Sequence, residues 1–250
     1  MTITRIAHGV ATHGNTLTLD TTGANLLVTW MCCFTTLDTM NENKSNGAAT
    51  TLASQTAAGD PIGRLSYWLG SLNVGTSHVF QASSTNTYGL YVAAYSGVQA
   101  YDSNVVGAAA TTGGTTAGPG TIDAPNNNSL FIYGCAENAG TAPTSDTSFA
   151  TLDNAALSGG VIYGSGFFER IEIGDAGSLT PTASWTTSAA HRIASMATFS
   201  PSVGGGVTYP QLERFGHRGA FRGMLHASPY PVRRSKGGVL YRDVNLARAA

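Results

Sequence analysis

The chain has 250 residues, a formal net charge of −1 and only 11% charged residues, well under the roughly 25% of an ordinary globular protein. Its 42% of hydrophobic residues is enough to build a core, which argues against a disordered chain, and the length allows one large β domain or two small ones. The low charge weakens repulsion between copies and favours a protein that joins an assembly.

The net charge conceals an asymmetry along the chain. Residues 1–209 hold five Lys or Arg against twelve Asp or Glu, a charge of −7, whereas residues 210–250 hold eight against two, a charge of +6. The change follows three consecutive glycines, Gly204–Gly206. Such a break at a Gly-rich junction indicates two segments with different roles. We therefore expect one domain over residues 1–203, and a junction with an extended basic arm over residues 204–250.

The three cysteines predict neither a disulfide framework nor a metal site. Cys32 and Cys33 are adjacent and would point to opposite faces of a strand, so at most one could reach Cys135. No His or Cys spacing fits a metal. We expect three reduced, buried thiols and no cofactor.

Neither a signal peptide nor a membrane span is predicted. The first residues lack the apolar run of a signal peptide, and no stretch of about 18 consecutive apolar residues occurs anywhere. We therefore expect synthesis in a cytoplasm and no membrane partner.

Short apolar clusters, rich in β-branched and aromatic residues, predict strands in the first part of the chain. A brief strand over Thr16–Leu19 ends in the turn Asp20–Gly23. Leu26–Phe34 has almost no polar member and predicts a central strand that is buried on both faces. The next two clusters, Arg64–Leu69 and His78–Gln81, are expected to pair with one another.

Further strands are expected over Tyr88–Tyr95, Leu130–Cys135 and His191–Phe199. Ser96–Gly97 should end the first of these. Gly107–Gly120 consists mainly of Gly, Ala and Thr and predicts a long exposed loop. Phe167–Ile173 alternates apolar with charged residues, which predicts a half-exposed strand whose charges pair on the solvent face.

Strands and turns of this kind predict an all-β fold. We expect a two-sheet antiparallel β-sandwich, jelly-roll or concanavalin-like, with the extended basic arm at its C-terminus.

The order of these clusters resembles that of β-sandwich (concanavalin-like) structural proteins of tailed-phage virions and prophages. The similar pieces, in order, are Gly23–Val28, Tyr67–Leu69, Gly75 with Val79–Phe80, Leu90–Val98, Asn128–Ile132 and Met196–Phe199. Ser96-Gly97-Val98 is the most distinctive piece, and Ala94 departs from the acidic residue that often stands there. The resemblance implies a virion component and transfers no catalytic residue.

Three groups of polar residues are candidate sites of chemistry. His191 with Ser195 lacks the nucleophile turn of a hydrolase triad. Glu169 and Glu172, three apart on a strand, point to opposite faces and cannot flank one glycosidic bond. A loop aspartate could take up calcium, but the loops have no D-x-D-x-D spacing; the candidates are Asp20, Asp38, Asp60 and Asp102. We therefore expect a protein that is not an enzyme.

Tyrosines offer a different kind of site. A Tyr ring has a flat apolar face and a polar tip, which suits a sugar. The candidates for a glycan-binding face are Tyr88, Tyr91, Tyr95 and Tyr101. Tyr91 and Tyr95 share strand parity and Tyr88 does not, so the alternative is that some lie in the core and some at the rim.

The basic arm carries the strongest local signal. Arg alternates with aromatic and aliphatic residues, while Gly and Pro forbid a long helix. The pattern predicts an extended peptide that docks on a partner surface, with rings in pockets and guanidinium groups on acidic groups. The residues expected to bind the partner are Arg214, Phe215, Arg218, Phe221, Arg222, Tyr230, Arg233, Arg234 and Tyr241.

Two alternatives remain for the arm. It could fold back on the acidic domain of its own chain, or it could bind nucleic acid, since Arg with aromatic residues also suits stacking and phosphate contact. The last apolar stretch, Val239–Leu246, is strand-like and could add to a neighbour's sheet edge.

We expect an accessory structural protein of a tailed-phage virion, located in the virion and anchored by its arm to other virion proteins of the capsid or tail. Capsid decoration or cementing is favoured over a head–tail or tail position. Low charge and a strand-adding arm also favour a homo-oligomer. The alternative from another class is a tail-fibre or receptor module that binds a glycan or a cell surface.

Overall fold

The computed structural model describes residues 2–12, 16–34, 36–57, 61–83, 87–107, 113–123, 128–157, 163–171, 177–201, 233–234 and 240–241. Every regular element in these ranges is a β-strand, and all pairings between them are antiparallel. The chain divides into two units, Met1–Gly204 and Gly205–Ala250. The first is called the body below.

Two main sheets form the centre of the body. Sheet I has the order β1 (Thr4–Thr12), β9 (Thr87–Ser96), β3 (Leu26–Cys33), β7 (Ile62–Leu69) and β5 (Thr50–Thr51), with β6 (Gln55–Thr56) also paired to β7. Sheet II has the order β10 (Val98–Val106), β19 (Arg192–Pro201), β13 (Leu130–Glu137), β16 (Tyr163–Ile171) and β15 (Ala150–Leu157).

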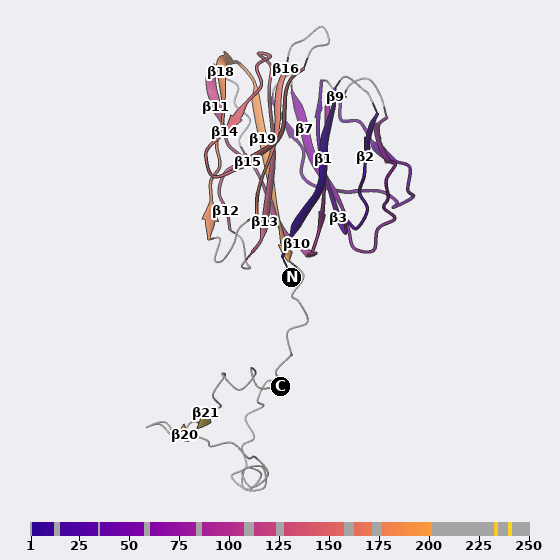
Figure 1. Cartoon of the computed structure of the whole chain (residues 1–250). Helices are drawn as coiled ribbons and strands as arrows, with labels where there is room; N and C mark the ends of the chain where they lie inside the picture. The colour runs from indigo at the N-terminus through magenta and orange to yellow at the C-terminus, as the bar shows by residue number, and fades with distance from the viewer. Residues whose placement is uncertain are drawn as a thin grey trace. The chain divides into compact units, whose positions relative to one another are not determined.

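A smaller layer covers the outer face of each main sheet. Cover I lies on sheet I and has the order β2 (Leu17–Leu19), β8 (His78–Ala82) and β4 (Met40–Glu42). Cover II lies on sheet II and joins β11 (Gly114–Ala117), β18 (Ala183–Ala189) and β14 (Thr144–Ser145) with the pair β12 (Ile122–Asp123) and β17 (Ser178–Leu179). Figure 1 shows the succession of layers in the body, with cover II at the left and β2 of cover I at the right.

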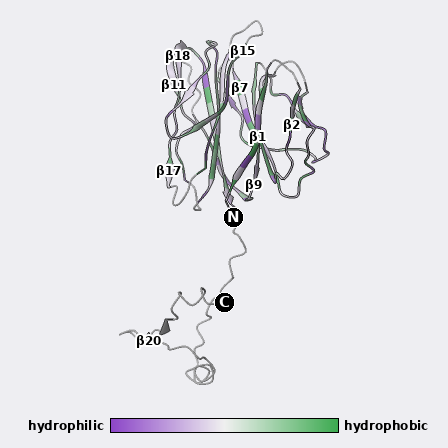
Figure 2. Ribbon diagram, viewed as in Figure 1, coloured by the Kyte–Doolittle hydropathy of each residue, from purple (hydrophilic) through white to green (hydrophobic). Residues whose placement is uncertain are grey.

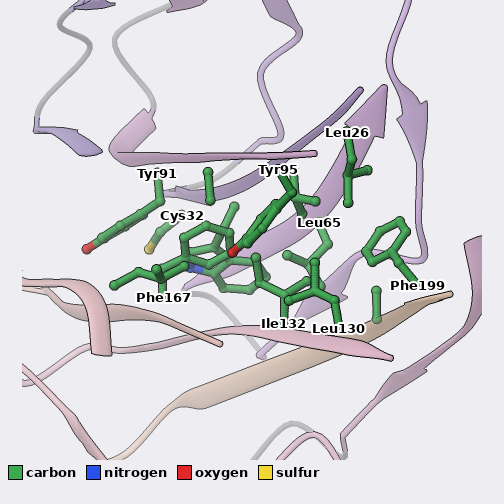
Figure 3. Close-up of a cluster of buried hydrophobic side chains, with 14 of the residues drawn as sticks. Leu26, Cys32, Leu65, Tyr91, Tyr95, Leu130, Ile132, Phe167 and Phe199 are labelled. Carbon is green, nitrogen blue, oxygen red and sulfur yellow. The ribbon is translucent and has the colours of Figure 1, made fainter. Parts of the chain in front are cut away.

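The inner faces of sheets I and II enclose the largest hydrophobic cluster (Figure 3). Trp30 of β3 lies at its centre, fully buried, and its Nε1 donates to Ser165 Oγ at 3.1 Å. Two glycines make room for the indole: a Cβ on Gly63 or on Gly134 would lie 2.1 Å from a ring atom. The ring is therefore held between a strand of each sheet, and only glycine fits at these two positions.

Two further clusters fill the spaces beneath the covers. Leu27, Met31 and Trp68 on the outer face of sheet I pack with Phe80 of cover I. On the outer face of sheet II the members include Phe131, Tyr133, Phe168 and Met196, together with Trp185 of cover II. Hydrophobic segments accordingly occur in strands of every layer of the body (Figure 2).

Burial on both faces was correctly predicted for the strand within Leu26–Phe34. Every residue of β3 is buried, since its even-numbered members from Leu26 to Cys32 face sheet II and Leu27, Met31 and Cys33 face cover I. The prediction of an all-β fold is also confirmed, and a face-to-face pair of antiparallel sheets forms its centre.

The turn at Ser96–Gly97 is the corner where the chain passes from sheet I to sheet II. Gly97 has φ +78° and no space for a side chain, because a Cβ would lie 2.4 Å from the Thr2 carbonyl oxygen. The Asn25 side chain clamps the corner by accepting from Val98 N at 3.2 Å and donating to Val98 O. The sequence pieces Gly23–Val28 and Leu90–Val98 therefore meet at this corner.

Three predicted local features were wrong. Arg64–Leu69 and His78–Gln81 do not pair, because β7 belongs to sheet I and β8 to cover I. Gly107–Gly120 includes strand β11, which pairs with β18, and its Pro119 is buried. Phe167 and Phe168 are both fully buried, one in each cluster beside sheet II, so the start of Phe167–Ile173 is not half-exposed.

Candidate functional site

Most of the arm residues predicted to bind a partner lie outside the described residues: Arg214, Phe215, Arg218, Phe221, Arg222 and Tyr230. The remaining three lie in a short antiparallel pair, β20 (Arg233–Arg234) with β21 (Leu240–Tyr241). Arg233 stands opposite Tyr241, and Arg234 stands opposite Leu240. The two strands, which residues 235–239 separate in the sequence, are thus neighbours within the arm.

The tyrosines do not form a sugar-binding face. Tyr91 and Tyr95 are fully buried between the main sheets, where Tyr91 Oη donates to Ser165 O at 3.0 Å. Tyr88 is also buried and packs on Tyr163. Tyr101 is half-buried and its ring stacks on Tyr67 with centroids 5.1 Å apart. The rings of Tyr88, Tyr91 and Tyr95 are buried because β9 is covered on both faces, whereas Tyr101 lies on β10.

Glu169 belongs to an ion pair at the edge of the sandwich rather than to a pair of catalytic acids. Its carboxylate accepts from Arg5 of β1 and from Tyr95 Oη at 2.7 Å. The Glu169 side chain is 8% exposed and that of Arg5 38%. Burial and the neighbouring carboxylate raise the pKa of Tyr95. The group ties the edge strand of sheet I to sheet II, and Glu172 lies outside the described residues.

The other predicted sites show no chemical constellation in the described part of the chain. Ser195 is buried in the middle of β19, and His191 precedes that strand. Asp20 accepts from Thr22 N at 3.0 Å and Asp38 from Thr87 Oγ1 at 2.6 Å, while Asp102 accepts from Ser200 Oγ. Asp60 is outside the described residues. No group of three His, Cys, Asp or Glu in these ranges is placed to hold a metal ion.

All three cysteines are free and buried, as predicted. Burial raises the pKa of the Cys33 and Cys135 thiols, which keeps them in the protonated, unreactive form.

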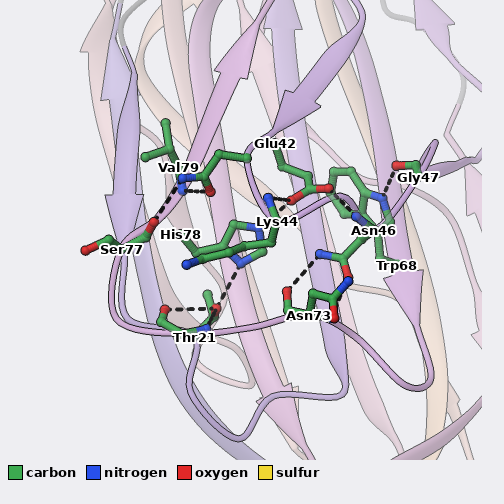
Figure 4. Close-up of polar contacts among 12 residues, drawn as sticks. Thr21, Glu42, Lys44, Asn46, Gly47, Trp68, Asn73, Ser77, His78 and Val79 are labelled. Carbon is green, nitrogen blue, oxygen red and sulfur yellow. Dashed lines mark hydrogen bonds and ion pairs between the residues drawn. The ribbon is translucent and has the colours of Figure 1, made fainter.

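Sequence reasoning missed a buried polar network between cover I and sheet I (Figure 4). His78 of β8 is fully buried, with Nε2 3.0 Å from Glu42 Oε2 and Nδ1 2.9 Å from Thr21 Oγ1. A carboxylate only accepts, so Nε2 carries the proton and the Thr21 hydroxyl donates to Nδ1. Burial lowers the pKa of His78, and the ring is therefore neutral at pH 7.

The carboxylate of Glu42 also holds the turn that follows β4. It accepts the backbone N–H groups of Lys44 and Asn46. Thr21, His78 and Glu42 thus have the order of a hydroxyl–imidazole–carboxylate relay, but Thr21 is itself fully buried. The network holds the backbone of the turn after β4, and a substrate cannot reach the buried Thr21 hydroxyl.

Two further contacts hold the segment after this turn. Asn46 exchanges hydrogen bonds with the backbone of Asn73, at 3.0 and 2.6 Å, and the indole of Trp68 donates to Gly47 O at 2.9 Å (Figure 4). Ser45 has φ +62° and Gly47 φ +76°. A left-handed serine costs free energy that the surrounding contacts must offset, so these hydrogen bonds stabilise the segment in this conformation.

A cavity of about 390 Å³ opens beside this segment. Arg64 and Ser66 of β7 line it from sheet I, and the residues from β4 and beyond that complete the lining are Thr39, Met40, Asn41, Glu42, Ser45, Gly47, Ala48, Ala49 and Thr51. Ser66 is 1% exposed. Its Oγ and the Nε of Arg64 are buried without a hydrogen-bond partner in the described structure, and each such group costs about 1–3 kcal/mol. The cavity is the candidate binding site of the body.

No protein family model, curated protein or solved structure matches this chain. The described ranges contain no helix that is long and apolar enough to span a membrane.

Proposed function

We propose that this chain is an accessory structural protein of a tailed-phage virion, with a jelly-roll or concanavalin-like body that the arm anchors to capsid or tail proteins. Capsid decoration or cementing is the favoured role, ahead of a head–tail position. The observation that carries the proposal is the separation of charge, −7 over residues 1–209 and +6 over residues 210–250. Opposite charges on two units of one chain favour association with a neighbour of complementary charge.

The contacts of the body's cations support this proposal. Arg5 donates to Glu169, Arg64 donates to the Asp38 carbonyl at 3.0 Å, and Arg192 is 5% exposed. The carboxylates of Asp20 and Asp123 are exposed. The body therefore presents these acidic groups, while Arg5 and Arg64 are bonded within it and Arg192 is buried. A neighbouring copy offers the arm an acidic surface, which favours a homo-oligomer within the virion.

Two changes to the arm test this function in the phage that encodes the chain. Deleting residues 204–250 is expected to leave a folded body that no longer joins particles. The double substitution Arg233→Glu and Arg234→Glu in the full chain should lower the occupancy of the protein on particles. It should also make that occupancy less sensitive to salt. The matched control is Arg233→Lys with Arg234→Lys, which keeps the charge. Full occupancy of the truncated body on purified virions contradicts the proposal.

A tail-fibre or receptor module that binds a glycan is the second candidate. The cavity beside cover I favours it, because hydroxyl and amide side chains surround a space large enough for a small ligand. A glycan array with the full chain tests this candidate, and an array without signal at high protein concentration counts against it.

A further inference from the structure

We infer that the cavity between β7 and the segment after β4 binds a small polyhydroxylated carboxylate, of which a hexuronic acid residue is the type. The inference is independent of the anchoring function and gives the ligand class for the second candidate. It follows from the groups that face the cavity, from their unused hydrogen-bonding capacity and from the fixed shape of the rim.

The floor of the cavity combines a guanidinium with a hydroxyl. Arg64 and Ser66 are two apart on β7 and therefore point to the same face of sheet I, the face that cover I overlies. One Nη of Arg64 is used by the Asp38 carbonyl, whereas Nε has no partner in the described structure, and neither has Ser66 Oγ. A planar carboxylate matches guanidinium N–H groups. Because Arg64 Nε and Ser66 Oγ are both buried, the ligand must seat against the floor of the cavity to accept from them.

The walls indicate hydroxyl groups on the rest of the ligand. Thr39, Asn41, Ser45 and Thr51 supply hydroxyl or amide groups, against Met40 and two alanines as the apolar part. No aromatic side chain lines the cavity, so a flat apolar ligand would find no stacking partner among these residues. The volume of about 390 Å³ lies near the lower end of small-molecule sites, roughly 300–1,000 Å³, and suits one sugar residue.

Glu42 also lines the cavity, and its carboxylate oxygens are already occupied by donors. The amides of Lys44 and Asn46 and the imidazole of His78 all donate to it. These hydrogen bonds spread its charge into the network, which reduces repulsion toward a bound carboxylate. They also fix the rim in advance, so binding requires little ordering of the protein.

Calorimetric titration of the full chain with D-galacturonate tests the inference, with D-galactose and acetate as matched probes. We expect galacturonate to bind at least about tenfold more tightly than either, because galactose lacks the carboxylate and acetate lacks the hydroxyls. Arg64→Gln should weaken galacturonate binding by about tenfold or more and Ser66→Ala by a few-fold. Arg170→Gln, on sheet II, is the control and should bind as the unchanged chain does.

Three results would overturn the inference. They are no heat of binding at tens of millimolar galacturonate, equal affinity for galactose or acetate, and full affinity in Arg64→Gln. If Arg64→Gln fails to fold, amide shifts of the unchanged chain decide the matter. Galacturonate should then perturb β7 and the segment after β4, and perturbation confined to other strands contradicts the site. Particle occupancy plays no part in these measurements, so anchoring and binding can fail separately.

Discussion

Cover I and cover II each pack on the outer face of one main sheet, but the side chains buried beneath them differ. Beneath cover I an apolar cluster lies beside buried polar groups, and His78 of β8 bonds to Glu42 of β4 within the cover. Cover II closes over rings, since Tyr133 stacks on Phe168 at 4.8 Å and meets Phe149 edge-on at 5.1 Å. The described cavity opens beside the polar groups of cover I. The candidate site accordingly lies on the side of cover I.

The largest effect is expected on the aromatic side. Phe168→Ala removes a fully buried ring and should lower the free energy of unfolding by about 3–5 kcal/mol. Urea denaturation followed by tryptophan fluorescence measures the loss. Phe168→Leu is the control and should lose less, because it keeps most of the volume. A loss under about 1 kcal/mol for the alanine would show that rings do not hold cover II.

A smaller loss is expected on the polar side. Glu42→Ala leaves His78 and the amides of Lys44 and Asn46 without their acceptor, and should cost about 2–3 kcal/mol. Glu42→Gln keeps one acceptor oxygen and should cost less. Hydrogen exchange should rise over β4 and β8 in the alanine variant. Unchanged exchange in both strands would contradict the role given to this network.

The pH dependence of stability should distinguish the two sides. Burial lowers the pKa of His78 in the folded state, so below the unfolded value of about 6.5 the unfolded chain binds the proton more readily. Stability is therefore lost as pH falls below about 6.5, by up to about 1.4 kcal/mol per pH unit from this group. His78→Gln should remove this part of the slope, and Phe168→Ala should keep it. Chemical denaturation between pH 7 and pH 5 measures both, and identical slopes in His78→Gln and the unchanged chain would contradict the assignment.

The smallest difference concerns one tryptophan on each side of the body, Trp68 of sheet I and Trp185 of cover II. Trp68 and Trp185 are each 4% exposed, but Trp68 Nε1 donates to Gly47 O, while Trp185 Nε1 is buried without a partner in the described structure. Changing either to Phe removes similar volume. Trp68→Phe should therefore cost about 1 kcal/mol more than Trp185→Phe. Thermal unfolding of the pair measures this, and equal losses would mean that the bond to Gly47 adds nothing.

Part of the candidate site was within reach of sequence reasoning. The strand Arg64–Leu69 was predicted, and its alternation puts Arg64 and Ser66 on one face. The sequence does not indicate what lies above that face, because β4 has three residues and β5 only two, too few to show a period. His78 and Glu42 are 36 residues apart and carry no shared motif. Only the pairing of β4 with β8 brings them together.

Local sequence determined those features whose cause is local. A run with one polar member made β3 buried on both faces, glycine set the corner at Gly97, and the three cysteines gave free thiols. Tertiary structure decided where alternating strands face, because alternation separates two faces without saying which of them another layer will cover. Cover II buried Phe168 on the face opposite Phe167, so the start of a strand predicted to be half-exposed is enclosed on both faces. Cover I turned the face of Arg64 and Ser66 into the floor of a cavity.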